Sequence, residues 1–326
     1  MSRIVHRLWI LLVLSLTFSI TSYASRVAAG QHVLQALSDG TVWTWGQNDD
    51  GQLGDGTIVP HAIPQQVPGL TSVIAVAAGI GGHSAALKGD GTVWTWGFNG
   101  DGEQGDGTTI ERHSPVQVNG LTGITAIAAG GSHIFALKND GTVWAWGLND
   151  NGQLGNDTKT RSLTPIQVSG LTGITAIAAG ALHSLAVKNN DTVWAWGDNS
   201  VGQLGDGTTT QRLTPVQASI LTGITAISGG PVSSLARKSD GTAWAWGLDA
   251  TATPAQVSGL SGVIDVAAGG NHRLALKSDG TVQAWGSNLF GQLGNGTQLD
   301  SLTPVQAIGV AGAIGIAVGG VLPVLR

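Results

Sequence analysis

The sequence predicts an all-β protein, a β-propeller of about six four-stranded repeat units. A Trp-x-Trp-Gly signature returns along the chain, and its second Trp stands at positions 45, 96, 146, 196, 246 and 285. Asp-Gly pairs separate strand-like runs in most of the units. Gly contributes 51 residues, whereas charged residues make up only 11% of the chain. A repeat of about 50 residues indicates a repeat architecture, and four strands per unit suit a propeller.

The N-terminal residues 1–24 have the features of a secretory signal peptide. Arg3 and Arg7 are basic, an apolar run extends from Leu8 to Ile20, and small residues precede a cleavage site after Ala24. This run is shorter than the roughly 20 residues that cross a bilayer. We therefore expect a single propeller domain over residues 25–326. We also expect export to the periplasm, the cell surface or the medium, without membrane association after cleavage.

Each unit contains four predicted strands, which are clearest between residues 124 and 168. Residues 124–130 form an apolar strand that ends in Gly, and residues 133–138 form a second strand with alternating side chains. Asp140-Gly141 predicts a type I′ hairpin turn leading to the Trp-x-Trp-Gly strand. After a loop rich in Gly and Asn, Pro165 opens the fourth strand, where a missing N–H does least harm.

The two Trp residues of each signature share one face of their strand, because side chains alternate along a strand. Eleven Trp residues occupy these equivalent positions, and Gln283 replaces the twelfth. One use of such an array is a surface that stacks carbohydrate rings. Because every copy has the same register inside a strand, we expect instead that the Trp residues pack between adjacent blades.

The repeat is irregular in two places. Gly147 and Pro165 are 18 residues apart, as in four other units, but Gly247 and Pro254 are only 7 apart, so the fifth unit has lost one loop. A further unit begins near Gly315 and is incomplete, while residues 26–30 are a clipped copy of the same strand. Two arrangements follow. Either six units close the ring by joining its termini, or the propeller has seven blades with an incomplete last one.

The repeat resembles a known family in many linked positions. These positions are Ile177–Lys188 with His183, Trp194–Asn199 and Gly202–Thr208, and related copies extend over about residues 26–320. They resemble the regulator of chromosome condensation repeat family, in a secreted, bacterial-type form. The resemblance implies a β-propeller, usually of seven blades. The founding member is a nuclear guanine-nucleotide exchange factor bound to chromatin, whereas some secreted members inhibit β-lactamase through loops on one face.

A His recurs once per unit and is the first candidate for chemistry. It stands at His83, His133, His183 and His272, while the fifth unit has Ser233. The first unit has Val33 at this register, with His32 one residue early. A residue that returns at the same place in each blade is expected to pack blades or cap turns. A ring of metal-binding imidazoles is the alternative.

Other motifs for catalysis and cofactors are weak. Asp55, Asp106 and Asp206 precede Gly in the long loops, but the order of a calcium loop is missing, so calcium is a minor alternative and no cofactor is expected. The chain has no Cys, no G-x-S-x-G motif and a net charge of −5. These features argue against thiol chemistry, a serine-hydrolase elbow and nucleic-acid binding.

The sequence therefore predicts a monomeric, non-enzymatic binding propeller whose partner is a protein or a cell-surface polymer. The alternatives are a guanine-nucleotide exchange regulator and an extracytoplasmic hydrolase with a site on the ring axis. Long loops that differ between repeats while the flanking strands do not are the expected contact regions. The candidate contact residues are Asn48, Asp49, Asp50, Phe98, Asn99, Asp101, Leu148, Asn149, Asp150, Asp198, Asn199, Asn288 and Phe290.

Overall fold

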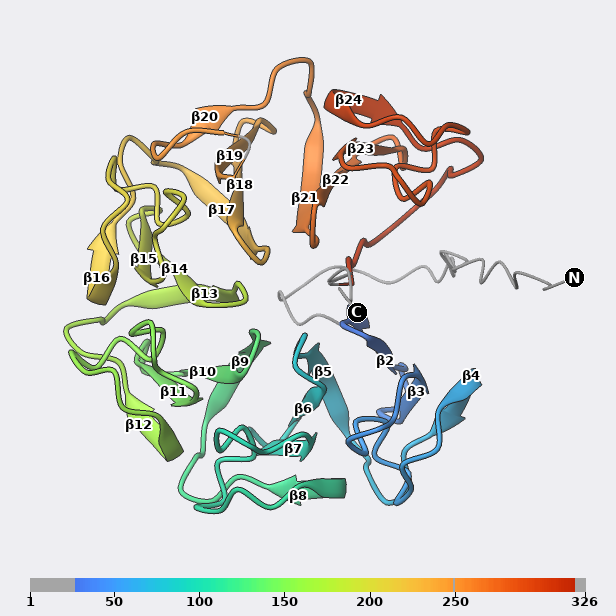
Figure 1. Cartoon of the computed structure of the whole chain (residues 1–326), viewed down its shortest axis with the longest axis vertical. Helices are drawn as coiled ribbons and strands as arrows, with labels where there is room; N and C mark the ends of the chain where they lie inside the picture. Colours follow the sequence, from blue (N-terminus) through green and yellow to red (C-terminus); the bar gives the residue numbers. More distant parts are fainter. Residues whose placement is uncertain (1–26, 249, 320–326) are drawn as a thin grey trace, which may run out of the picture.

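The computed structural model describes residues 27–248 and 250–319, over which the chain forms 24 β-strands and no helix. The strands make six antiparallel sheets of four, and each sheet takes its strands in chain order. Figure 1 shows these sheets as blades around a common centre, each with its first strand innermost. The predicted six-unit propeller is therefore confirmed. The predicted signal peptide, residues 1–24, lies outside the described residues.

The blades follow one another along the chain. The first contains β1 (Val27–Ala29), β2 (His32–Ala36), β3 (Val42–Gly46) and β4 (His61–Gln66), and the second contains β5 (Val73–Ala78), β6 (His83–Lys88), β7 (Val93–Gly97) and β8 (Arg112–Gln117). The third contains β9 (Ile124–Ala129), β10 (His133–Lys138), β11 (Val143–Gly147) and β12 (Ser162–Gln167), and the fourth contains β13 (Ile174–Ala179), β14 (His183–Lys188), β15 (Val193–Gly197) and β16 (Arg212–Gln217). The fifth contains β17 (Ile224–Gly229), β18 (Ser233–Lys238), β19 (Ala243–Gly247) and β20 (Ala255–Gln256), and the sixth contains β21 (Val263–Ala268), β22 (His272–Lys277), β23 (Val282–Gly286) and β24 (Ser301–Gln306).

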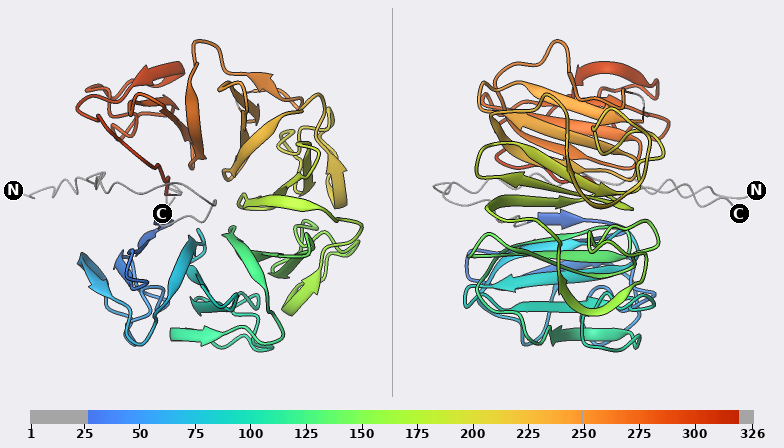
Figure 2. Two further views of the ribbon diagram at one scale, coloured as in Figure 1. Left: turned by 180° about the vertical axis from the view of Figure 1, so that it is seen from behind. Right: turned by 90° about the vertical axis from the view of Figure 1, so that its left-hand side faces the viewer.

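The strands run roughly along the ring axis, as the side view in Figure 2 shows. The Asp-Gly hairpins therefore emerge on one face of the ring, which we call the turn face. The long loops after each Trp-x-Trp-Gly strand leave on the opposite face, which we call the loop face. Within the described part of the chain, no helix has the length and hydropathy that a bilayer crossing requires.

The hairpin turns are real, but the predicted type I′ geometry is wrong. In the first blade the Gly40 N–H donates to the Leu37 carbonyl, and Gly40 has a φ of 80°. This is a type I turn followed by a left-handed glycine. A type I′ turn would need Asp39 in the left-handed conformation as well. Its role is instead to stabilise the turn, because its carboxylate accepts hydrogen bonds from the N–H and the hydroxyl of Thr41. In the fourth blade, Asp191 takes the left-handed place with a φ of 59°.

The outermost strands begin earlier than the Pro positions predicted, except in the fifth blade, where β20 begins directly after Pro254. β12 begins at Ser162, three residues before Pro165. Its pairing with β11 shifts register between Ala145 and Gly147, opposite the segment that contains this proline. A proline on the outer edge, beside such an irregularity, removes no hydrogen bond that a regular ladder needs.

Adjacent blades are joined by the second Trp of each signature. Trp196 is fully buried, lies edge-on at 5.8 Å from Phe135 of the preceding blade, and donates its indole N–H to the Gln153 carbonyl at 2.8 Å. The Ser184 hydroxyl donates to the same carbonyl. We call this contact the carbonyl staple. Equivalent bonds run from Trp96 to Gln52, from Trp146 to Glu103 and from Trp246 to Gln203. The expected packing between blades is therefore confirmed for the second Trp of the second to sixth blades. The first Trp of each signature and Trp45 are only partly buried.

The ring closes near its axis through residues 313–319, which take the place of the innermost strand of a seventh unit. The Ala313 N–H donates to the Gly280 carbonyl, just as the Val263 N–H donates to the Gly241 carbonyl at the start of β21. At the end of the segment, a Cβ on Gly319 would come within 2.8 Å of the Gly30 carbonyl of the first blade. The ring therefore has six complete blades and one additional inner segment, seen as the red coil that runs inward from β24 in Figure 1.

Candidate binding surface on the loop face

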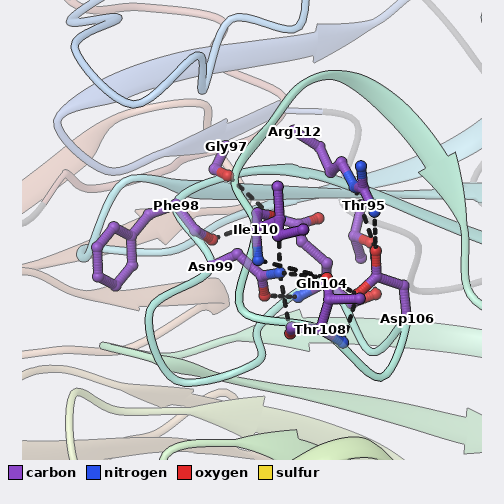
Figure 3. A network of polar contacts seen from close by, with 9 residues as sticks. All are labelled: Thr95, Gly97, Phe98, Asn99, Gln104, Asp106, Thr108, Ile110 and Arg112. Atoms are coloured by element: carbon purple, nitrogen blue, oxygen red, sulfur yellow. Dashed lines mark hydrogen bonds and ion pairs between the residues drawn. The ribbon is translucent and has the colours of Figure 1, made fainter.

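The long loops of the loop face are organised by one asparagine each. In the second blade, the Asn99 side chain donates to the carbonyls of Thr108 and Ile110, at 3.1 and 2.9 Å, and accepts from the Gln104 N–H at 2.9 Å (Figure 3). One buried amide thus satisfies three backbone groups of a loop that has no ladder of its own. The same pattern occurs at Asn48, Asn149, Asn199 and Asn288.

These five asparagines were predicted to contact a partner, and the structure assigns them a different role. Each is fully buried, with 0% of its surface exposed. A buried side chain whose polar atoms are all engaged cannot reach a partner without unfolding its loop. We therefore remove Asn48, Asn99, Asn149, Asn199 and Asn288 from the contact surface. Their return at one position of every complete loop was the available signal, and it is the same signal that identified the His as structural.

The acidic residues at the loop ends are engaged within the loop. Asp106 accepts from the Thr108 hydroxyl and pairs with Arg112 at 2.8 Å (Figure 3). Although partial burial opposes it, these hydrogen bonds and the guanidinium hold the pKa of Asp106 below its usual value. Asp206 pairs with Arg212 in the same way. Among the described residues, no group of three or more His, Asp or Glu side chains has the arrangement of a metal site.

The remaining predicted residues differ in exposure. Asp49 and Asp150 are exposed, whereas Phe98 and Leu148 are partly buried. Asp101, also partly buried, pairs with Arg161 of the next blade at 3.2 Å.

Two further predicted residues are also partly buried. Asp198 accepts from the Gln203 amide within its own loop, and burial raises the pKa of Asp50. Phe290 differs from all of these, because it is an aromatic side chain that is 73% exposed.

The sixth blade gathers exposed apolar side chains on its long loop and outermost strand. Leu289, Phe290, Leu299 and Leu302 are 65%, 73%, 75% and 83% exposed. We call these four residues the apolar loop patch. Sequence reasoning found Phe290 and the variable segment 287–290 that also contains Leu289, and it missed Leu299 and Leu302. The signal was their contrast with other repeats, since Asp49, Asp150 and Ser200 stand where the sixth blade has Leu289.

Phe290 is exposed because no complete blade follows the sixth within residues 27–319, the part of the chain that the structure describes apart from residue 249. At the equivalent position, Asp101 reaches Arg161 of the next blade and Asn151 accepts from Gln211 of the next blade at 3.3 Å. A Cβ on Gly291 would meet nothing within 4 Å, whereas one on Gly102 would collide with the next blade. The sixth loop therefore presents to solvent the side that other loops bury.

The recurring His residues pack the blades together. His83, His133 and His183 are fully buried, and a Cβ on Gly79 would lie only 2.0 Å from the His83 ring. Burial lowers the pKa of His83 to about 4 and that of His133 to about 3, so the imidazoles are neutral at neutral pH. The position expected for the first unit was wrong. His32, not Val33, pairs opposite Gly46, because the hairpin that follows sets the strand register.

A His–Ser contact between blades has no catalytic access. The Nε2 atom of His183 lies 2.9 Å from the Ser234 hydroxyl, which donates its proton to the Gln203 carbonyl. His183 and Ser234 are both fully buried, so a substrate cannot reach the hydroxyl. Exposed apolar side chains on the loop face include the apolar loop patch and, in the first blade, Ile58 and Val59. Such side chains can bind a partner but have no reactive atoms.

The chain is similar in sequence to known propeller proteins. A family model described as the RCC1-like domain matches residues 15–322. Human E3 ubiquitin-protein ligase HERC2 is 41% identical over 31% of this chain, and the Arabidopsis thaliana ultraviolet-B receptor UVR8 is 38% identical over 29% of it. The match spans only 2% and 22% of those two proteins. These relatives are eukaryotic, so the expected bacterial-type membership is not supported by them.

Two solved structures have the same fold. Human WBSCR16 superposes with a TM-score of 0.81 at 23% identity, over 93% of this chain and 86% of that one. Yeast RCC1 (Prp20), solved with Kap60 bound to it, superposes with a TM-score of 0.76 at 26% identity, over 86% of this chain and 73% of that one.

Proposed function

Because this chain belongs to the RCC1-like domain family, we propose that it is a monomeric, non-enzymatic propeller that binds a protein through its loop face. The apolar loop patch carries this proposal. Exposed aromatic and aliphatic side chains gathered in one region are typical of protein-binding surfaces. The likeness to yeast RCC1, which was solved as a complex with Kap60, supports a protein partner over a cell-surface polymer.

We propose further that the protein acts outside the cytoplasm, because residues 1–24 have the charge and apolar run of a signal peptide. Mass spectrometry of the protein made by its own host tests this. We expect an N-terminus at Ser25 and recovery outside the cytoplasm. An intact N-terminus on cytoplasmic protein would contradict export and would favour the nucleotide-exchange alternative.

The binding proposal is tested by affinity capture from the compartment in which the protein is found, with wild type and Phe290→Asp side by side. A charge at the centre of an apolar contact is costly to bury, so we expect at least a tenfold loss of the captured protein. Ile220→Asp is the matched control, since Ile220 is 70% exposed but lies on the β16–β17 connection. Equal capture by all three proteins would contradict binding through the patch.

A further inference from the structure

Four inter-blade interfaces are completed by a glycine of the preceding loop that rests on the outermost segment of the next blade. A Cβ on Gly102 would lie 2.5 Å from the Leu163 side chain and 2.8 Å from its Cα, and Gly152 has the same relation to Leu213. Gly51 rests on His113 and Gly202 on Ala252 in the same way. The φ of Gly102 is 90°. A side chain at this position is therefore excluded both by the lack of space and by the backbone conformation.

The interface between the fifth and sixth blades lacks this loop. The chain passes from Gly247 to Pro254 in seven residues, and β20 keeps only Ala255–Gln256. Leu302 of β24 is the equivalent of Leu163 and Leu213, which are partly buried. With no loop above it, Leu302 is 83% exposed, the highest value among the large hydrophobic side chains of the described residues.

The carbonyl staple of this interface is also incomplete. Trp96, Trp146, Trp196 and Trp246 each donate to a loop carbonyl. The Trp285 indole N–H makes no such hydrogen bond to a described residue. Trp285 is 4% exposed, whereas those four are 0% exposed. Arg273 stands where the second, fourth and fifth blades have the staple serine, and it donates to the Leu248 carbonyl at 2.6 Å. This bond holds the two blades together without filling the place above Leu302.

We propose that Leu302, Thr303 and Trp285, which we call the loop seat, bind a glycine-containing loop of a partner protein. The chain's own loops define the chemistry of this ligand. A glycine with positive φ lies flat on the residue equivalent to Leu302, and the next backbone carbonyl accepts from the Trp indole. A partner loop of this form would bury a leucine and satisfy an indole N–H in one contact. This inference rests on the proposed binding function and assigns part of its surface and the class of its ligand.

The first test uses a synthetic peptide with the sequence of residues 198–210, the chain's own fourth loop, added to the full-length protein. The readout is the ¹H–¹⁵N spectrum of the Trp indole groups, with the Trp285 signal assigned by its loss in Trp285→Phe. We expect a saturable shift of that signal below about 1 mM peptide, which corresponds to roughly 4 kcal/mol of binding free energy. The same peptide with valine in place of Gly202 should not shift the Trp285 signal.

The second test restores the missing loop in the protein itself. In this variant the eleven residues missing between Gly247 and Pro254 are supplied from the equivalent loop of the fourth repeat. The restored loop should cover Leu302 and prevent the peptide from binding. Leu302→Asp should weaken binding of the peptide by at least tenfold, while Ile220→Asp, on the β16–β17 connection and outside the apolar loop patch, should leave it unchanged. If the Trp285 signal does not move, or moves equally in the loop-restored variant, the loop seat is wrong. Capture of a partner that depends on Phe290 would still stand, so the two proposals fail separately.

Discussion

Glu103 is the residue whose chemistry differs most from its equivalents in the other long loops. All four of the other complete loops have a glutamine at its position, namely Gln52, Gln153, Gln203 and Gln292. The Glu103 side chain is fully buried and accepts a hydrogen bond from the Asp101 N–H at 3.0 Å. Burial, with a smaller contribution from the nearby Asp101 carboxylate, raises the pKa of Glu103 from 4.5 to about 7. Its ionisation above neutral pH places an uncompensated charge between the second and third blades.

We predict that Glu103→Gln removes a pH-dependent loss of stability. Between pH 4.5 and 7 the folded chain keeps the Glu103 proton that the unfolded chain has released, so the free energy of unfolding falls as pH rises. The variant should match wild type near pH 4.5 and exceed it by about 2–3 kcal/mol above pH 8. Urea denaturation at a series of pH values measures this difference. A difference that does not change with pH would contradict the prediction.

The carbonyl staple is the contact through which each loop stabilises the next blade. It combines a buried Trp, a buried hydroxyl and one backbone carbonyl, as at Trp196, Ser184 and Gln153. Trp45 is the equivalent Trp of the first blade, and it is only partly buried. Among the described residues, no complete blade precedes this one. The same residue at the same strand position therefore has two environments within one molecule.

We predict that Trp196→Phe lowers the free energy of unfolding by about 2–3 kcal/mol, because it removes a buried indole and its hydrogen bond. Trp45→Phe should cost less than about 1 kcal/mol, since its indole donates to no carbonyl among the described residues. Thermal and urea unfolding of both variants provide the comparison. Equal losses in the free energy of unfolding would mean that the carbonyl staple contributes no stability beyond that of the larger indole side chain.

The elements of this fold were predictable because each unit repeats the same local signals. Alternation, Asp-Gly pairs and the Trp-x-Trp-Gly strand located all four strands of a blade. The binding residues were less predictable, because exposure depends on the neighbouring blade as well as on the local sequence. Asn99 looked like a variable loop residue and is buried, whereas Leu302 was not among the predicted contact residues and is exposed by a deletion in another unit.

Closure of the ring depends on a segment that is not a full blade. Val310, Ile316 and Val318 pack against the buried face of the sixth blade, and Gly319 lies against Gly30 of the first. Neither end of the chain supplies a complete seventh sheet within the described residues. The contact between the sixth and first blades is therefore concentrated near the axis.

We predict that Val318→Asp loosens the ring by placing a charge against Gly269 of the sixth blade, at a cost of about 1–3 kcal/mol. Hydrogen–deuterium exchange followed by mass spectrometry should show faster exchange in β1 and β21 and little change in β9 and β13. Ile308→Asp is the control, because Ile308 is 70% exposed in the same blade. Unchanged protection of β1 in Val318→Asp would show that the ring closes by other contacts.

The carbonyl staple also gives the ring a direction. Each of the first four loops offers its carbonyl to the following blade and never to the preceding one. Besides Trp285, a Trp45 donor in the first blade and a Gln292 acceptor in the sixth therefore remain unmatched among the described residues. Growth of such a ring is therefore possible in one orientation only, with a new unit offering its Trp to Gln292 and its own loop to Trp45. A design that duplicates one repeat at this position would therefore find both complementary groups, the Gln292 carbonyl and the Trp45 indole, already present in the sequence.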